Sequence, residues 1–571
     1  MSKKASDVMV EILEKAGAKH CYGIVGDTLN HFTDSIANSS IEWVHVRHEE
    51  AGAFAAGAEA LMSGHLTVCA GSCGPGSLHF INGLFEAHRN GAPVVLIASQ
   101  LENSQPHVVN LPQYVDFKKI YQDCSVFCEE VHNASQVRLV MTLACQAAIN
   151  QRGVAVVIMP ANISEMQLDD ELMFRPHFSK PLLMANPQEL EQARDLLAEQ
   201  RKITIFAGIG CQQAREQMLA LAEKLQAPIV FTSRAKDFID YDNPYAMGMN
   251  GLFGHKSARY AIENCDLLLL LGVDFAWAQY YPDTAKKIQI DAKVMHLGRR
   301  YPIDLGIVGH MLPTLQALLP LVSNNPDQMF LQDCLKQRDQ TLQDRAQEER
   351  IGKDGVIHPQ YLMALMSQYA DDDAFFTADT GSPMVWVLRH IDVNGKRRTL
   401  PSLLHASMAN AMPQALGIKK AYPERQVIAI CGDGGLAMLM GDLLTIVQEN
   451  ITIKIVVINN RSLNYVEIEQ EAEGLLDHYT ELKNPDFGKL AEVIGFKGFT
   501  QKTGDGLEQT VQEFLQHDGP ALLDVHTSME LVMPPEAEAE QVKGFSMYAA
   551  KALLSGRFDE VTKKLKDTYI N

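Results

Sequence analysis

Short, continuous apolar segments recur along almost the whole chain and alternate with stretches of helical periodicity. Typical segments are "PVVLIAS", "VAVVIMP", "KITIFAG", "DLLLLLGV" and "IKIVVIN". A strand that is apolar on both faces must be covered on both faces, so these segments predict parallel strands joined by crossover helices. The expected fold class is therefore α/β, with several doubly wound sheets.

Two stretches interrupt this alternation and divide the chain. Residues 164–187 are punctuated by proline and lack periodicity, and residues 323–359 hold a charged helical segment between polar ends. A length of 571 residues also fits about three domains. We therefore expect three doubly wound parallel-sheet domains at residues 1–165, 185–325 and 355–530, followed by a separate tail at residues 531–571.

The composition argues against several classes of function. A net charge of −20 does not suit nucleic acid as a general partner, because phosphate binding requires a basic surface. No apolar run approaches the ~18–20 residues of a membrane span. Val8, Ile12, Leu13 and Ala16 mark a helix near the amino end, and interspersed acids exclude a secretory signal. The ten cysteines lack C-x₂-C spacing, so reduced thiols in a cytoplasmic protein are expected.

Glycines and an acid follow the apolar segment "QVIAICG". Gly434 and Gly435 come directly after Asp433, and the next apolar strand ends at Asn460. In a βαβ unit both ends lie at the carboxyl edge of the sheet, where ligands bind. Glycine lets backbone amides approach an anion, and carboxylate and amide oxygens suit Mg²⁺ that is shared with a phosphate. The pattern predicts a magnesium–phosphate site with Asp433 and Asn460 as metal ligands; a tight turn and a helix cap would explain the same residues.

A second acidic motif lies in "VHVRHEEAGAFAAGAEALMSG", residues 44–64. Glu49 and Glu50 stand where an alanine-rich helix is expected to begin, and the helix dipole alone would explain acids there. Together with the glycine–aspartate motif, however, the pattern resembles the thiamine-diphosphate enzymes. In that family a glutamate contacts the aminopyrimidine ring of the cofactor, and the resemblance assigns this role to Glu49. The chemistry needs such a group, because a carboxyl bonded to the ring nitrogen favours the tautomer that activates the thiazolium carbon.

Within that family the chain resembles the bacterial flavin-containing pyruvate oxidases, which include pyruvate dehydrogenase (quinone). The resemblance covers nearly the whole chain and includes "AGSCGPGSLHFINGLFEAHRN", "SMANAMPQALG" and "KGFSMYAAKALLSGRFDEV". It implies thiamine diphosphate, Mg²⁺ and FAD as cofactors. The implied reaction is the oxidative decarboxylation of pyruvate to acetate and CO₂, with electrons passing through FAD to a membrane quinone. The family's cofactor lies between two subunits, so a homo-oligomer is expected, with a dimer as the minimum and a tetramer anticipated.

The resemblance also implies the site residues. The catalytic residues would be Glu49, Gln113 and Tyr465. The residues that contact thiamine diphosphate would be Glu49, Ala406, Ser407, Met408, Asp433, Gly434, Gly435, Asn460 and Tyr465. The FAD-binding residues would be Asn250, Gly251, Leu252, Phe253, Val273, Asp274, Phe275, Ala276, Trp277 and Asp291.

The tail differs in charge from the rest of the chain. Residues 541–571 contain more basic than acidic residues, and one helical face there would carry Val561, Leu565, Thr568 and Tyr569, at the spacing i, i+4, i+7 and i+8. A short basic amphipathic segment suits weak binding to a lipid surface, whereas a helix docked on its own domain is the alternative. The resembled family uses this tail as a membrane anchor. The resemblance therefore implies a cytoplasmic protein that associates peripherally with the inner face of the cell membrane.

Several positions depart from the pattern expected of the flavin-containing pyruvate oxidases, namely Pro112, His310, Thr380, Ala406 and Tyr465. Tyr465 stands where the quinone-linked enzymes carry a mobile phenylalanine, and Pro112 precedes Gln113 where an aromatic residue is usual. Three alternatives stay open: a phosphate- and oxygen-dependent pyruvate oxidase, an acetolactate synthase, and a non-catalytic cofactor-binding paralogue.

Overall fold

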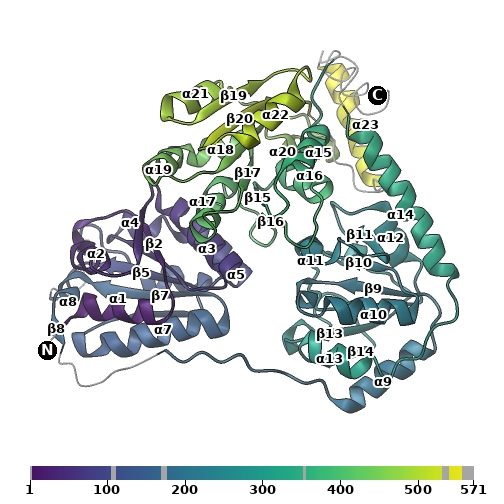
Figure 1. Cartoon of the computed structure of the whole chain (residues 1–571), viewed down its shortest axis with the longest axis horizontal. Helices are drawn as coiled ribbons and strands as arrows, with labels where there is room; N and C mark the ends of the chain where they lie inside the picture. The colour runs from purple at the N-terminus through teal and green to yellow at the C-terminus, as the bar shows by residue number, and fades with distance from the viewer. Residues whose placement is uncertain (1–2, 105–110, 169–175, 351–354, 530–538, 556–571) are drawn as a thin grey trace.

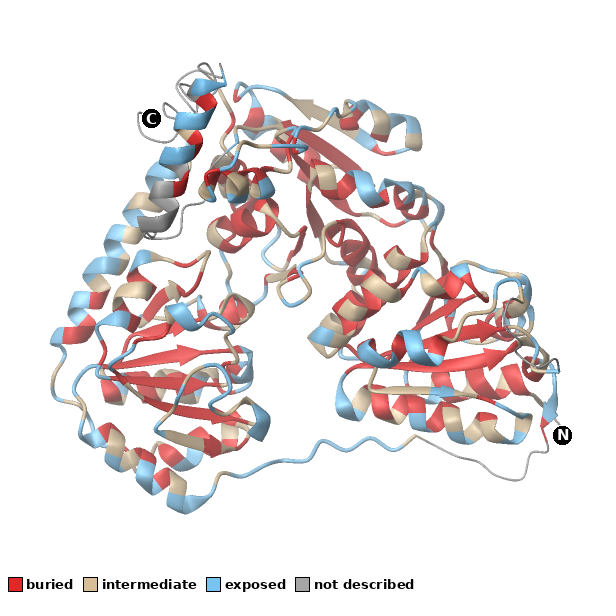
Figure 2. Cartoon of the chain, turned by 180° about the vertical axis from the view of Figure 1, so that it is seen from behind, coloured by how far each residue is buried: buried red, intermediate tan, exposed pale blue. Residues whose placement is uncertain are grey.

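Three parallel sheets of six strands each form the framework of the chain (Figure 1). The computed structural model describes residues 3–104, 111–168, 176–350, 355–529 and 539–555. Helices cover both faces of each sheet, and Figure 2 shows that the strands are largely buried. The predicted fold class of three doubly wound parallel-sheet domains is therefore confirmed. The physical reason is that neither face of a continuously apolar strand can be left in water.

The amino-terminal sheet has the order β3-β2-β4-β5-β7-β6. Its strands are β2 (His20–Gly23), β3 (Glu42–His45), β4 (Thr67–Gly71), β5 (Val94–Gln100), β6 (Phe127–Glu130) and β7 (Val154–Pro160). Its helices are α1 (Ala5–Lys15), α2 (Asn30–Ala37), α3 (Glu49–Ser63), α4 (Pro75–Leu78), α5 (Ile81–Asn90), α6 (Phe117–Tyr121), α7 (Val137–Gln151) and α8 (Ala161–Ser164). Two short strands, β1 (Lys3–Lys4) and β8 (Gln167–Leu168), pair antiparallel beside them. The expected amino-terminal helix is α1, whose Val8, Ile12 and Leu13 are buried.

The central sheet has the order β11-β10-β9-β12-β13-β14. Its strands are β9 (Ile203–Ala207), β10 (Ile229–Phe231), β11 (Ala246–Met249), β12 (Leu267–Leu271), β13 (Lys286–Asp291) and β14 (Leu305–Val308). Its helices are α9 (Pro187–Ala198), α10 (Arg215–Leu225), α11 (Lys236–Ile239), α12 (Lys256–Glu263) and α13 (Met311–Leu318). The charged segment that follows forms α14 (Met329–Glu348), which runs along the outside of the molecule towards the third domain (Figure 1).

The third sheet has the order β16-β15-β17-β18-β20-β19. Its strands are β15 (Phe375–Ala378), β16 (Arg398–Pro401), β17 (Val427–Gly432), β18 (Lys454–Asn459), β19 (Lys497–Gln501) and β20 (Ala521–His526). Its helices are α15 (Pro359–Tyr369), α16 (Ser382–His390), α17 (Ala411–Ala421), α18 (Asp433–Leu439), α19 (Leu443–Gln448), α20 (Asn464–Ala472), α21 (Phe487–Ile494), α22 (Leu507–Gln516) and α23 (Ala539–Leu554).

The third domain shares an apolar core with each of the other two. One core joins buried alanines of α3 to apolar residues of α17, and these two helices lie side by side in Figure 1. Gly417 permits this close approach, because a Cβ there would lie 2.0 Å from the carbonyl oxygen of Ala55. A second core joins Ile239 of the central domain to Ile391 of the third. The third domain is thus the hub of the molecule.

The helix α23 docks on the end of α20. A Cβ at Gly544 would lie 1.6 Å from the carbonyl oxygen of Ala472, and Lys551 Nζ donates to the Gly474 carbonyl oxygen at 2.7 Å. The first part of the tail therefore adopts the alternative of a helix packed on its own domain. The amphipathic pattern from Val561 to Tyr569 lies outside the described residues.

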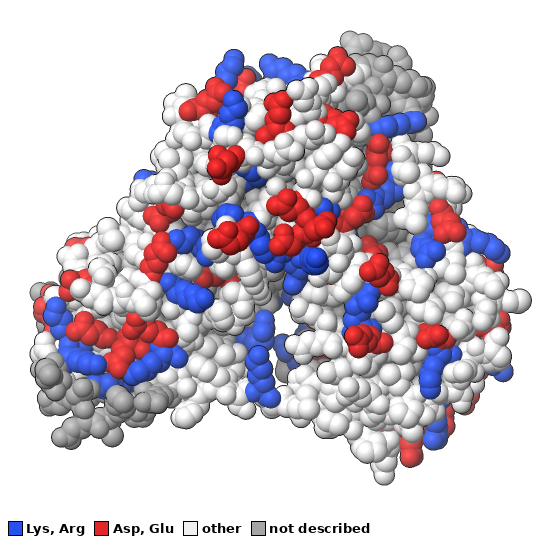
Figure 3. Space-filling model, in the orientation of Figure 1, with Lys and Arg blue, Asp and Glu red and all other residues white. Residues whose placement is uncertain are grey.

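The described surface carries both signs of charge. Figure 3 shows basic and acidic side chains interspersed over one face. Within the described ranges, no helix combines the length and the apolar character that crossing a bilayer requires. All ten cysteines are free thiols.

Candidate cofactor site

Asp433 occupies the turn at which β17 passes into α18. The side chain is 3% exposed, and its Oδ1 accepts a hydrogen bond from Gly434 N at 3.0 Å. Its Oδ2 accepts from Arg461 N at 2.8 Å and from Asn484 Nδ2 at 2.7 Å. Burial raises the pKa of Asp433 to about 6, against the lowering effect of these donors. The donors in the described structure are all neutral, so a divalent cation fits the unbalanced negative charge of this buried carboxylate.

The asparagine pair lies at the same edge of the sheet. β17 and β18 are neighbours, with Gly432 opposite Ile458, so Asp433 and the end of β18 come together as expected. Asn459 faces inward: its Nδ2 donates to Asp524 Oδ1 at 2.9 Å and its Oδ1 accepts from Asn484 at 3.2 Å. Asn460 Oδ1 accepts from Ser462 N at 3.1 Å.

The oxygen atoms that Asp433 and Asn460 offer favour one kind of metal ion. No group of three His, Cys, Asp or Glu side chains that could hold a metal occurs within the described residues. One carboxylate and one amide oxygen are hard ligands, too few for an all-protein cage. They suit Mg²⁺, which retains waters and binds substrate phosphates. The residues present therefore fit a magnesium ion that is bound together with a diphosphate.

Asp379 was not identified from the sequence, although it organises this region. It follows β15 and is fully buried. Its carboxylate accepts from Ala411 N at 2.9 Å and from Gly432 N at 3.1 Å. A Cβ at Gly435 would lie 2.2 Å from Asp379 Oδ2, so this position requires glycine. Burial raises the pKa of Asp379 to about 7. The carboxyl group thereby fastens the start of α17 to the glycine-rich turn.

Glu49 is the first residue of α3 and is 6% exposed. Its Oε2 lies 2.9 Å from His79 Nδ1, and the His79 ring stacks on His48 with centroids 4.7 Å apart. A Cβ at Gly76 would approach Glu49 Oε1 to 3.3 Å. Glu49 is therefore a buried carboxyl that is oriented by His79, a residue that the sequence motifs do not indicate.

Gln113 contacts the turn formed by residues 72–76, on the side away from Glu49. Its φ of 64° places it in the left-handed region, and a Cβ at Gly74 would lie 2.8 Å from its carbonyl oxygen. Cys73 Sγ lies 3.6 Å from Gln113 Oε1. The turn from Ser72 to Gly76 thus has Glu49 at one end and Gln113 at the other.

Asn82 connects the start of α3 with the segment that precedes α17. Its Nδ2 donates to Glu50 Oε1 at 2.6 Å and to Ser407 Oγ at 3.0 Å. Ala406 adopts a φ of 59°, and Met408 Cε lies 3.5 Å from the Cβ position of Gly434. Contacts within one chain therefore link Glu50 to Met408. In the described part of the chain no hydrogen bond joins Glu49 itself to Asp433.

The positions assigned to FAD lie where β11, β12 and β13 end. Asn250 is buried, and its Nδ2 donates to the Tyr280 carbonyl oxygen at 3.1 Å. Gly251 has a φ of 109°, and a Cβ there would lie 2.7 Å from the Phe275 ring. Leu252 and Phe253 continue this loop. Carboxyl ends of parallel strands are where such sheets bind ligands.

Acidic residues lie at the ends of β12 and β13. Asp274 pairs with Arg299 and Arg300. Asp291 Oδ1 accepts from Lys293 N at 2.8 Å. The other members of this set differ in exposure: Val273 is buried, Phe275 is half-buried, and Ala276 and Trp277 are exposed.

A position assigned to FAD contacts a position assigned to thiamine diphosphate through two aromatic rings. The rings of Phe253, from the central domain, and Tyr465, from the start of α20, pack edge to face with centroids 6.3 Å apart. Burial raises the pKa of Tyr465 to about 12, and Glu469 and Tyr280 act in the same direction. The phenol is therefore neutral at physiological pH.

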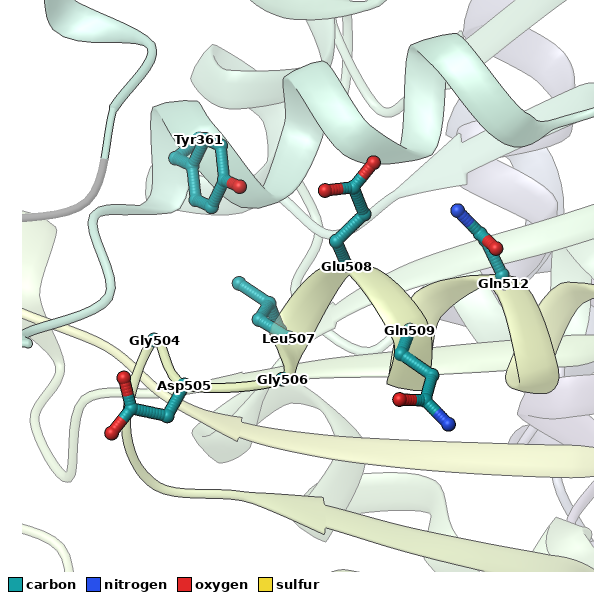
Figure 4. Close-up of a pocket in the computed structure, with 8 residues that line it drawn as sticks. All are labelled: Tyr361, Gly504, Asp505, Gly506, Leu507, Glu508, Gln509 and Gln512. Atoms are coloured by element: carbon teal, nitrogen blue, oxygen red, sulfur yellow. The ribbon is translucent and has the colours of Figure 1, made fainter.

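A surface depression of about 490 Å³ lies elsewhere in the third domain (Figure 4). Tyr361 of α15 and the first turns of α22 line it. It shares no residue with the positions described above.

Comparison with known proteins identifies the family. Three domains of the thiamine pyrophosphate enzymes match the chain. The N-terminal TPP binding domain matches residues 3–120, the central domain matches residues 190–318, and the C-terminal TPP binding domain matches residues 379–525. The "Putative thiamine pyrophosphate-containing protein YdaP" of Bacillus subtilis (strain 168) is 33% identical over 96% of both chains. The "Pyruvate oxidase" of Lactiplantibacillus plantarum is 29% identical over 93% of this chain and 90% of its own. The "Acetolactate synthase isozyme 2 large subunit" of Escherichia coli (strain K12) is 27% identical over 94% and 99%. The chain therefore belongs to the thiamine pyrophosphate enzyme family, as its motifs predicted.

Proposed function

We propose that the chain is a pyruvate oxidoreductase that uses thiamine diphosphate, Mg²⁺ and FAD. It converts pyruvate to acetate and CO₂ and passes two electrons through the flavin to a membrane quinone. The observation that carries the proposal is the contact of Phe253 with Tyr465. It brings the positions assigned to FAD against those assigned to thiamine diphosphate, and electron transfer between two cofactors requires such proximity.

Asp433 and Asn460 would hold the magnesium ion, and the amides of Gly434 and Gly435 would face the diphosphate. The side chain of Met408, beside Gly434, would contact the thiazolium ring. When bound, thiamine diphosphate supplies the electron sink that decarboxylation of a 2-keto acid needs. The chain itself contributes binding, orientation and exclusion of water.

Glu49 would hold a proton at the aminopyrimidine nitrogen. His79 already contacts Oε2, so Oε1 is the oxygen left for this bond. The side chain is buried at the start of a helix that packs on the third domain, which fixes its direction. A homodimer belongs to this proposal, because the resemblance implies that the cofactor lies between the amino-terminal domain of one subunit and the third domain of its partner.

The quinone is proposed as the acceptor because of the tail. Helix α23 packs on the end of α20, and α20 begins with Asn464 and Tyr465. A basic segment that binds a lipid surface would therefore act on the same helix that carries the ring next to Phe253. Peripheral association with the membrane belongs to this proposal.

The test is anaerobic mixing of the purified protein, thiamine diphosphate and Mg²⁺ with pyruvate, with the flavin absorbance recorded. We expect bleaching, followed by reoxidation by a quinone in the presence of lipid vesicles. Reoxidation that requires oxygen and phosphate and yields acetyl phosphate would identify the oxygen-dependent oxidase instead. An oxidised flavin with accumulating acetolactate would identify a synthase, and a protein that binds no flavin would refute the proposal.

A further inference from the structure

Two consecutive charged residues are buried where the central domain meets the third domain. Lys236 and Asp237 begin the short helix α11 and are 3% and 5% exposed. Charged side chains are seldom buried without partners, because leaving water costs them solvation. Every hydrogen bond that these two side chains make in the described structure is to the third domain.

Lys236 contacts the carboxyl end of α16. Its Nζ donates to the carbonyl oxygen of Ile391 and, at 3.4 Å, to that of Val387. The last carbonyl groups of a helix are unpaired within the helix and carry partial negative charge, so an ammonium group is well placed there. Burial lowers the pKa of Lys236 to about 8, while Asp240 acts to raise it. The lysine therefore caps a helix of a different domain.

Asp237 contacts a different element of the third domain. Its Oδ2 accepts from Thr399 N at 2.7 Å and from Arg398 Nε at 3.2 Å, both on β16. Its Oδ1 accepts from Thr399 Oγ1 at 2.7 Å. The guanidinium of Arg398 also lies over the Phe238 ring, 4.5 Å from its centroid. One turn of helix thus binds both α16 and β16.

These contacts supply direction that the apolar core does not. Ile239 and Ile391 belong to one core, so the hydrophobic effect holds the two domains together. That attraction is non-directional and permits sliding, whereas hydrogen bonds to charged groups are strong and have a preferred geometry. Lys236 and Asp237 therefore specify how one domain is oriented on the other.

The elements that Lys236 and Asp237 join lead, on both sides of the domain contact, to the proposed cofactor positions. On the flavin side, Asn250 N donates to the carbonyl oxygen of Phe231 at 3.0 Å, and Phe231 ends the strand that leads into α11. On the thiamine side, α16 begins at Ser382, whose Oγ accepts from Asn464 Nδ2 at 3.1 Å, next to Tyr465. The helix α16 thus runs from the Lys236 contact to the thiamine diphosphate positions.

We propose that Lys236 and Asp237 are positioning residues that set the separation of Phe253 and Tyr465, and with it the rate of electron transfer to the flavin. The proposal rests on the proposed function, because that function requires the two cofactors to communicate. A single edge-to-face ring contact is too weak to orient two domains by itself.

The first test measures hydrogen–deuterium exchange of the Lys236→Met variant, purified as the full chain without added thiamine diphosphate. Methionine keeps the length and apolar stem of lysine, so the core can persist. We expect exchange in residues 387–391 and 250–254 to rise at least tenfold. The matched control is Lys224→Met, because Lys224 Nζ donates to the carbonyl oxygens of Leu319 and Val322, after α13, entirely within the central domain. This control should leave both segments unchanged. Unchanged exchange in the Lys236 variant would overturn the proposal.

The second test separates positioning from catalysis. Anaerobic single-turnover experiments with pyruvate should give a CO₂ burst within twofold of the wild type in Lys236→Met, while flavin reduction slows at least tenfold. Equal slowing of both steps, or normal flavin reduction, would overturn the proposal. If Lys236→Met does not fold, Thr399→Val removes only the hydroxyl donor to Asp237 and should slow flavin reduction about threefold. A wild type that purifies without flavin would refute the proposed function, whereas the exchange comparison would still decide the orienting role.

Discussion

The contact of α3 with α17 allows a quantitative prediction at Gly417. A Cβ at this position would lie 2.0 Å from the Ala55 carbonyl oxygen and 2.6 Å from the Ala55 carbonyl carbon. Carbon–oxygen contacts are normally no shorter than about 3.3 Å, so Gly417→Ala must separate the two helices by roughly 1.3 Å. The opposing atoms belong to helix backbone and cannot rotate away.

The free-energy change combines two terms. Overpacking typically costs about 1–3 kcal/mol, and a rigid backbone partner places this site at the upper end. Alanine is a better helix former than glycine by about 1 kcal/mol, which offsets part of the cost. The expected net loss in the free energy of unfolding is about 2 kcal/mol. For a domain of about 150–250 residues, this loss lowers the midpoint of thermal unfolding by about 4–8 °C.

Differential scanning calorimetry provides the measurement, and Gly441→Ala provides the control. A Cβ at Gly441 meets nothing within 4 Å, so its midpoint should stay close to that of the wild type. Because α3 begins with Glu49, the displaced helix should also weaken thiamine diphosphate binding in the Gly417 variant. Equal midpoints for the two variants would refute the close packing of α3 on α17.

Two further predictions concern the cofactor site. Glu49→Gln keeps the size of the side chain and should leave the midpoint and flavin content unchanged, yet slow flavin reduction by pyruvate at least 100-fold in stopped-flow measurements. A rate like that of the wild type would contradict the role of Glu49. Asp433→Asn removes the one anionic magnesium ligand of the pair, so titration calorimetry should show at least tenfold weaker binding of thiamine diphosphate with Mg²⁺. Chelation of the metal from the wild type should have the same effect, and affinity that withstands both changes would rule out the metal site.

Strands could be read from the sequence because their chemistry is local. The segments "DLLLLLGV" and "IKIVVIN" form β12 and β18 because continuous apolar side chains leave no exposed face. Asp433 and the end of β18 lie at the same sheet edge, as expected for a βαβ unit. The helical segment after Gly432 is less regular than these strands. It begins at Asp433 and is interrupted at Met440–Asp442, where Asp442 accepts a hydrogen bond from Arg47 N of the amino-terminal domain.

The remaining site residues depend on contacts between distant segments. Asp379 acquires its role only once β15 lies beside β17, with Ala378 opposite Ile430. His79 becomes a partner of Glu49 through the packing of the Ser72–Gly76 turn. Lys236 and Asp237 have the sequence pattern of ordinary surface charges, and nothing local shows that another domain will bury them. Tertiary burial, which one sequence does not reveal, accounts for these omissions.

The shared core of α3 and α17 has a consequence for biosynthesis. The ribosome produces the alanine-rich face of α3 early, but its covering helix emerges only after the whole central domain has been made. The apolar face of α3 in the nascent amino-terminal domain must therefore stay exposed to solvent for many seconds, because translation adds about 5–20 residues per second. Chaperone dependence and aggregation of prematurely terminated chains are the expected results.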